Sequence, residues 1–239
     1  MILKLKNNYI KYCFISILFI CVFQSERVFA AREPIIRVLI SKSNNLRIRS
    51  DRSIPLTIEG KFFSRKRIKG LTLKNEKNKK ILYFDRNKQK KYDLKSNQKF
   101  QVSSSDGRGI WVGQKRFAGK LNLFVLDSEI LVVNVLGIEK YLNSVVGSEM
   151  PTKWPIEALK AQAIASRTYA LKQKGNNLFD IDSTQKNQVY NGLESRTYKT
   201  IRAVKSTRSL VLTYKNKLIN ALFHSSSCLL YTSDAADDW

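Results

Sequence analysis

The amino-acid sequence predicts an α+β fold in which antiparallel strands accompany a central buried helix. Short runs of apolar and polar residues alternate from Ile35 to Gly137, as in the strands of an antiparallel sheet. A long helical pattern then extends from Pro155 to Leu171 and is apolar nearly all the way round, which is typical of a helix enclosed by its domain. A chain of 239 residues with 43% hydrophobic residues is long enough for such a core.

Residues 1–30 have the three parts of a secretory signal peptide. A lysine-containing start precedes an apolar run from Cys13 to Phe23, and small residues end at Ala30. The run is shorter than the roughly 20 residues that span a bilayer, so cleavage after Ala30 is expected rather than permanent anchoring. We therefore expect an exported protein of the cell envelope, periplasm or medium, and no nucleic-acid partner despite the net charge of +24.

Residues 31–130 form the strand-rich, basic part of the predicted domain. Strands are expected between Ile35 and Ile58 and again up to Gly137, with a hairpin turn at Asp127 and Ser128. Between Lys61 and Lys99, fifteen Lys or Arg residues stand against three acidic ones. Two interpretations stay open, a patch for anionic polymers of the cell envelope and a solvated sheet face with basic loops.

Cysteine and histidine counts exclude several kinds of chemistry. The three cysteines are Cys13, Cys21 and Cys228, so the body of the chain can build neither a disulfide framework nor a cysteine-based zinc site. His224 is the single histidine, which excludes multi-histidine metal sites, and no Gly-x-Ser-x-Gly motif accompanies it. We expect no cofactor and no metal.

Glu149 is the candidate catalytic residue. A short helix is expected from Ile138 to Val146 with its end at Gly147, so that Glu149 begins the loop into the long helix. Lys160 and Arg167 interrupt the apolar long helix, and buried cations require partners. Glu149 is therefore either a catalytic carboxylate or the structural partner of one of these cations.

A polar segment follows the long helix, from Asp182 to Gly192. Its side chains are of the kind that hydrogen-bond sugars, although a capped turn would have a similar composition. A helix is expected over residues 194–205, and two strands over residues 209–214 and 218–223 around a turn at 215–217.

About a hundred residues resemble the stage II sporulation protein D family, also called the LytB or amidase-enhancer family. The resemblance is carried by YLNSVVGSEMPTKWPIEALKAQAIASRTYAL, preceded by LVVNVLGIEKYL and followed by DSTQKNQVYNGL and AVKSTRSLVLTYKNKLINALFHSSS. It implies that residues 31–227 form one domain of this family, with residues 131–227 as its signature part. It also implies that the chain departs from the family after Ser227, where two glycines and a further portion of the domain normally follow.

Residues 228–239, CLLYTSDAADDW, look like the translation of a sequencing adapter. We therefore expect that they are not part of the native gene and that the domain is truncated at its C-terminal side.

The resemblance implies a peptidoglycan lytic transglycosylase that cleaves glycan strands between N-acetylmuramic acid and N-acetylglucosamine, with peptide-free glycan as the expected substrate. Glu149 matches the family's glutamate and would be the general acid and base. The alternative is a non-catalytic wall-binding protein that stimulates an N-acetylmuramoyl-L-alanine amidase, so the expected partners are glycan strands and such an amidase. The substrate-binding residues that the family resemblance implies are Lys160, Gln162, Arg167, Gln185, Gln188, Tyr190, His224 and Ser226.

Overall fold

The structure is a computed structural model that describes residues 33–51, 54–61, 63–76, 79–84, 87–173 and 175–223. The expected signal peptide, the expected adapter segment, His224 and Ser226 lie outside these ranges. All described residues belong to one unit that begins at Glu33. Among them no helix is both long and apolar enough to cross a membrane.

The larger sheet has seven strands in the order β13-β1-β12-β11-β8-β3-β4. Their bounds are β1 (Ile35–Lys42), β3 (Leu56–Gly60), β4 (Phe63–Ile68), β8 (Lys99–Ser104), β11 (Lys120–Val125), β12 (Ile130–Gly137) and β13 (Ile181–Asp182). Its neighbours pair antiparallel except for β13, which lies parallel to β1 with Val38 opposite Ile181. A segment from beyond the long helix thus returns to the first strand of the chain.

The smaller sheet has six strands in the order β10-β9-β2-β5-β6-β7. Their bounds are β2 (Leu46–Ser50), β5 (Gly70–Glu76), β6 (Lys79–Phe84), β7 (Asn87–Leu94), β9 (Ile110–Val112) and β10 (Lys115–Phe117). Alternate residues of both sheets meet in one core, to which the larger sheet contributes Ile58 and Val102 and the smaller sheet Ile48 and Leu73. The predicted alternation is therefore the pattern of two sheets that bury facing surfaces.

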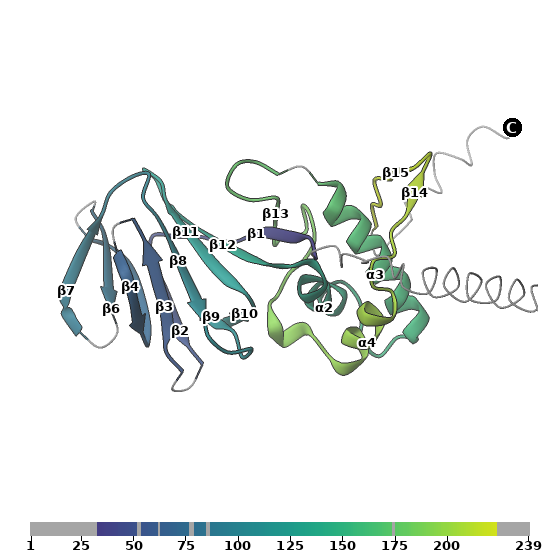
Figure 1. Cartoon of the computed structure of the whole chain (residues 1–239), viewed down its shortest axis with the longest axis horizontal. Helices are drawn as coiled ribbons and strands as arrows, with labels where there is room; N and C mark the ends of the chain where they lie inside the picture. Colours follow the sequence, from purple (N-terminus) through teal and green to yellow (C-terminus); the bar gives the residue numbers. More distant parts are fainter. Residues whose placement is uncertain are drawn as a thin grey trace, which may run out of the picture. The chain divides into compact units, whose positions relative to one another are not determined.

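The helices lie beside the end of β12 in the larger sheet (Figure 1). Their bounds are α2 (Ile138–Glu149), α3 (Ile156–Lys172) and α4 (Tyr198–Ser206), with a 3₁₀ turn η1 (Leu193–Ser195) before α4 and a hairpin of β14 (Thr213–Tyr214) and β15 (Lys217–Leu218) after it. Helix α2 begins directly at the end of β12, with Gly137 as its N-cap, and it contacts both α3 and α4. Strand β12 therefore positions α2, and α2 positions the rest of the helical part.

The α+β fold class, the hairpin at Asp127 and Ser128 and the long helix are confirmed. The helix expected over residues 194–205 is observed as η1 followed by α4. The strands expected over residues 209–214 and 218–223 are wrong in extent, because only Thr213 and Tyr214 of the first and Leu218 of the second pair in the hairpin, together with Lys217 of the expected turn. Lys215 and Asn216, the two residues between β14 and β15, both have positive φ, which is the geometry of a tight two-residue hairpin turn.

Candidate functional site

Glu149 is the last residue of α2 and is half-buried. The expectation that this helix ends at Gly147 is wrong, because Gly147 serves close packing rather than termination. A Cβ atom at Gly147 would lie 1.9 Å from the backbone oxygen of Ser195. The glycine therefore lets the η1 segment approach the helix, and α2 continues for two more residues to present Glu149 at its end.

The segment from Gln188 to Asn191 lies against the end of α2. The Val189 N–H donates to Oε1 of Glu149 at 2.5 Å, and the Asn191 N–H donates to Oγ of Ser148 at 3.2 Å. The Ser148 hydroxyl in turn donates to the backbone oxygen of Ser144 at 2.9 Å. Two successive residues of α2 thus hold alternate backbone N–H groups of this segment.

The side chains of Gln188 and Tyr190 point into the core and hold the segment in place through hydrogen bonds to core residues. The Gln188 amide accepts a hydrogen bond from the Tyr141 hydroxyl at 3.0 Å and donates to the backbone oxygen of Ser166 at 3.3 Å. The Tyr190 hydroxyl donates to Oδ1 of Asn134 at 2.8 Å, and its ring lies 5.1 Å from that of Tyr141. Both side chains are at most 1% exposed, so the structure makes them supports of the site rather than surfaces for a sugar.

Three effects act on the ionisation of Glu149. Burial raises the pKa of its carboxyl above the ordinary value of 4.5, and the hydrogen bond from the Val189 N–H opposes part of that rise. Its place at the C-terminal end of a helix adds the negative end of the helix dipole, which also disfavours the carboxylate. No ion pair joins Glu149 to a cation within the part of the chain that the structure describes. The surroundings therefore shift the equilibrium of Glu149 toward the protonated acid relative to a carboxyl group in water.

The structural partnership considered for Glu149 with Arg167 is wrong. Arg167 is 1% exposed and binds Glu139 instead, with Nε to Oε1 at 2.9 Å and Nη2 to Oε2 at 2.8 Å. Its remaining N–H groups donate to the backbone oxygens of Ala163, Val204 and Leu210. The guanidinium is saturated by protein groups, so its role is to join α2, α3 and the end of α4.

The pairing considered for Lys160 with Glu149 is also wrong, since Lys160 binds Glu157 at 2.8 Å on the surface of α3. The Gln162 amide donates to the Ser166 hydroxyl at 3.0 Å on the same helix. Gln185 is exposed on the loop after β13. The helix is also less enclosed than expected, because its buried residues begin only at Leu159 and Ala161 is exposed.

Sequence reasoning missed Glu139 and Asn134. Glu139 lies in the first turn of α2 and carries no local signal that it faces a cation far along the chain. Asn134 did carry a signal, because it is the one polar residue in the apolar run ILVVNVLG of β12. A fully buried amide in such a run requires partners, which are Tyr190 and the backbone oxygens of Ala118 and Lys120.

Within the described ranges, no three His, Cys, Asp or Glu side chains come together as metal ligands. The chemistry that this arrangement offers is proton transfer by one carboxyl group. A half-buried acid with a raised pKa, held by a single backbone donor, can give up a proton and take one back.

The chain is similar to proteins that are named for sporulation and for the enhancement of an amidase. Residues 126–214, which include Glu149 and the segment around Tyr190, match the model of the family described as Stage II sporulation protein. An uncharacterized protein of Brachyspira hyodysenteriae is 42% identical over 131 residues, which are 53% of this chain and 35% of that protein.

Two relatives come from Bacillus subtilis. Its amidase enhancer is 42% identical over 86 residues, 36% of this chain and 12% of the relative. Its stage II sporulation protein D is 36% identical over 125 residues, 45% of this chain and 36% of the relative. The alignments thus cover 36% or less of the length of each of these relatives.

Proposed function

Residues 126–214 of this chain belong to the stage II sporulation protein D family, and from this we propose that the protein is exported and acts on the bacterial cell wall. Its activity is that of a lytic transglycosylase, which cleaves peptidoglycan glycan strands between N-acetylmuramic acid and N-acetylglucosamine. Peptide-free strands are the preferred substrate. The observation that carries the proposal is the Glu149 carboxyl at the end of α2, whose pKa is raised by burial.

Glu149 acts first as the acid. Its protonated carboxyl donates to the glycosidic oxygen while the bond from that oxygen to the anomeric carbon of N-acetylmuramic acid breaks. The resulting carboxylate then takes the proton of the sugar's own 6-hydroxyl as O6 forms a bond to the anomeric carbon. The proton on Glu149 is restored, no water is consumed, and the cleaved strand ends in a 1,6-anhydro sugar.

One carboxyl group suffices for this sequence of steps. An ordinary hydrolase needs a second carboxylate, either to activate water or to attack the sugar. In the transglycosylase the substrate's hydroxyl is the nucleophile, and the same residue serves as acid and base. The backbone N–H of Val189 stabilises Glu149 in its charged form between the two steps.

The remaining residues have different parts in this proposal. Gln188 and Tyr190 position the segment that holds Glu149, and Arg167 joins the helices that carry it. Gln185, which is exposed, and Lys160 and Gln162, which are partly exposed on α3, remain candidates for contact with the glycan. His224 and Ser226 keep that role on the family resemblance alone.

A second candidate function is supported by the amidase enhancer of Bacillus subtilis among the relatives. In that case the protein binds the wall without cleaving it and stimulates an N-acetylmuramoyl-L-alanine amidase. The two functions predict different products, which are cleaved glycan strands in the first case and peptides released from peptide-bearing peptidoglycan in the second.

The test uses glycan strands that an amidase has freed of peptides and from which the amidase has been removed. The transglycosylase produces strand ends that are lighter by one water than reducing ends, which mass spectrometry distinguishes. Glu149→Gln should remove these products. Glu157→Gln is its matched control, because Glu157 is an exposed glutamate of α3, and it should keep the activity. Products with only reducing ends would contradict the transglycosylase mechanism. The absence of products from these strands, together with faster release of peptides by an added amidase from peptide-bearing peptidoglycan, would support the second function instead.

A further inference from the structure

The outer face of the larger sheet, which faces away from the smaller sheet, is covered at one side and open at the other. Over β1 and β12, Leu39, Leu131 and Val133 form a separate apolar cluster with Leu178 and Phe179 of the loop before β13. Over β11, β8 and β3, the outward residues are polar except for Phe124 of β11, which packs against this cluster. The sheet therefore has an apolar, covered part and a polar part that no described segment covers with such a cluster.

Polar side chains on the open part form rows across the strands. Glu59 of β3 lies opposite Gln101 of β8, which lies opposite Asn122 of β11. A parallel row joins Thr57, Ser103 and Lys120. Neighbouring strands are about 4.8 Å apart, so each row offers hydrogen-bonding groups at regular short intervals. Such rows suit an extended polymer with many hydroxyl groups.

Two clefts lie on this open part and share Glu59. One, of about 770 Å³, extends from Ser103 and Lys120 to Lys140 and Asn143 of α2. The other, of about 630 Å³, extends from Gln101 and Asn122 to Lys61 and Lys99. Both clefts are lined by Glu59, and together they are called the groove; Glu149 lines neither of them.

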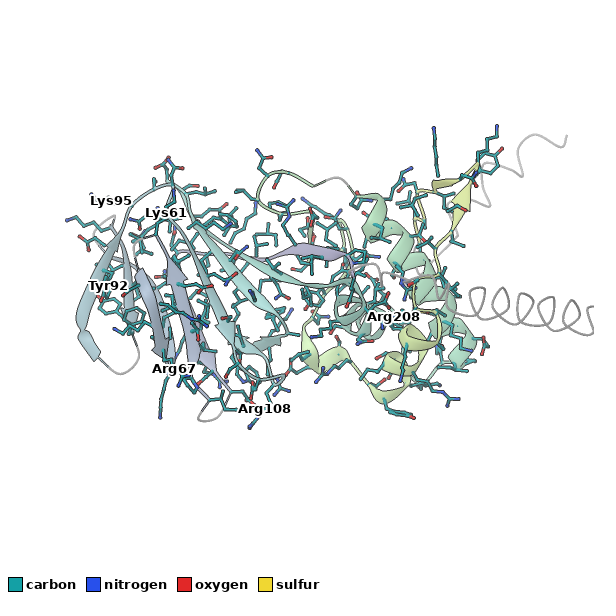
Figure 2. The ribbon with its side chains drawn as sticks, in the orientation of Figure 1. Lys61, Arg67, Tyr92, Lys95, Arg108 and Arg208 are labelled. Carbon is teal, nitrogen blue, oxygen red and sulfur yellow. The ribbon has the colours of Figure 1, made fainter. Side chains whose placement is uncertain are left out.

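The charge of the groove is predominantly positive. Its cationic side chains are all exposed and come from separate strands, loops and helices: Lys61, Arg65, Lys99, Lys120, Lys140 and Arg196. Its carboxylates already have partners, since Glu59 accepts from Gln101 at 2.7 Å and lies 4.0 Å from Arg65, and Asp106 lies 3.0 Å from Arg108. Figure 2 shows Lys61 and Arg67 near opposite ends of β4, the edge strand beside this face.

The helical end of the groove contains an unsatisfied acceptor. Oδ1 of Asn143 is buried and receives no hydrogen bond from the residues that the structure describes. A buried acceptor without a donor is unfavourable, so a hydroxyl group of a bound molecule would be a favourable partner after a small rotation of the amide.

We propose that this groove binds a polysaccharide that carries about one carboxylate per repeating unit, at a site separate from Glu149. The cations come from different strands, loops and helices rather than from one cluster, which suits a chain whose negative charges are separated from one another. The amide and hydroxyl rows bind the sugar hydroxyls between them. The binding holds the protein on an anionic polymer of the envelope and does not depend on the proposed cleavage reaction.

The test measures binding of fluorescein-labelled polygalacturonate to the full chain by fluorescence anisotropy at 0.15 M salt. Lys99→Gln combined with Lys120→Gln should raise the Kd about tenfold, because each exposed lysine contributes a modest ionic contact. The matched control combines Lys205→Gln with Lys217→Gln, which are exposed lysines outside the groove, and should change the Kd less than about twofold. Both double variants lose the same net charge.

Equal weakening by the two double variants would overturn the proposal, since it would show attraction by net charge alone. No weakening by either would overturn it as well. Poly-glutamate of the same length should bind more weakly than polygalacturonate, and equal binding would refute the role of the sugar hydroxyls. Glu149→Gln should bind polygalacturonate like the unaltered protein, so a failed cleavage assay and a failed binding assay remain distinguishable.

Discussion

The two ends of helix α2 each carry a glutamate, and the two glutamates are in opposite electrostatic surroundings. Glu139, in the first turn, forms a two-point ion pair with the buried Arg167. Glu149, in the last turn, has one backbone donor and no cation paired with it among the described residues, and burial raises its pKa. The first carboxyl group is held in an ion pair with a buried guanidinium, and the pKa of the second is raised by burial.

On the proposed function, this difference teaches that two glutamates ten positions apart on one helix can have a structural role and a chemical role. The N-terminal end of a helix favours negative charge and the C-terminal end disfavours it. The fold adds to this asymmetry, because the only fully buried arginine among the described residues, Arg167, lies at the N-terminal end of α2. The comparison yields predictions that differ in size.

The largest expected loss of stability comes from removing Arg167. Arg167→Leu leaves Glu139 without its partner and breaks the hydrogen bonds that join α3 to the end of α4, so the free energy of unfolding should fall by about 3–5 kcal/mol. Lys160→Leu is the matched control on the same helix, because its partner Glu157 is exposed, and it should change stability by less than about 1 kcal/mol. Urea unfolding measures both. Equal losses would mean that burial does not distinguish the two cations.

A smaller loss is expected from Gly147→Ala, which tests the packing that brings the Glu149 end of α2 against η1. Alanine favours a helix over glycine by about 1 kcal/mol, yet its Cβ would lie 1.9 Å from the Ser195 backbone oxygen. We expect a net destabilisation of about 1–3 kcal/mol by thermal unfolding. Gly107→Ala, where nothing lies within 4 Å of the added atom, should be near neutral. A stabilising Gly147→Ala would show that the η1 segment does not need this close approach.

The smallest expected effect is a pH dependence that belongs to Glu149. A carboxyl whose pKa is raised by folding contributes stability that is fully present below its unfolded pKa and is lost as the pH rises through the folded pKa. The unaltered protein should therefore lose stability relative to Glu149→Gln as the pH rises from below 4.5 toward neutrality. Unfolding curves for both proteins across this range measure the difference. Parallel pH curves would show that ionisation of Glu149 carries no cost.

Local patterns were sufficient to predict much of the fold. Alternation predicted the strands, the absence of Gly and Pro predicted α3, and Asp127 and Ser128 predicted the hairpin between β11 and β12. The parallel pairing of β13 with β1 was not predictable in this way, because it joins Ile181 to Val38 and depends on the whole fold.

The site was predicted only in part, for the same physical reason. Glu149 was found as a candidate, and buried Arg167 was expected to need a partner, but the choice among glutamates is made by packing of distant segments. Gln188 and Tyr190 were expected to contact the glycan because of the family resemblance, which assigns this polar segment to the substrate groove. The structure instead satisfies their polar groups with Tyr141, Ser166 and Asn134 in the core. A residue type indicates which hydrogen bonds a buried side chain needs. It does not indicate whether a ligand or another part of the protein provides the partners.

The central claim, that Glu149 performs chemistry while Glu139 maintains structure, is tested most directly by measuring turnover and stability for Glu149→Gln and Glu139→Gln side by side. Glu149→Gln should lower turnover on peptide-free glycan by about 10²- to 10⁴-fold while the protein stays folded, because glutamine keeps the shape and cannot exchange the proton. Glu139→Gln should lower the free energy of unfolding by about 3 kcal/mol through the unpaired Arg167, while the fraction that remains folded keeps its turnover. If Glu149→Gln instead lowers stability and leaves turnover of the folded fraction nearly intact, the catalytic assignment of Glu149 is wrong.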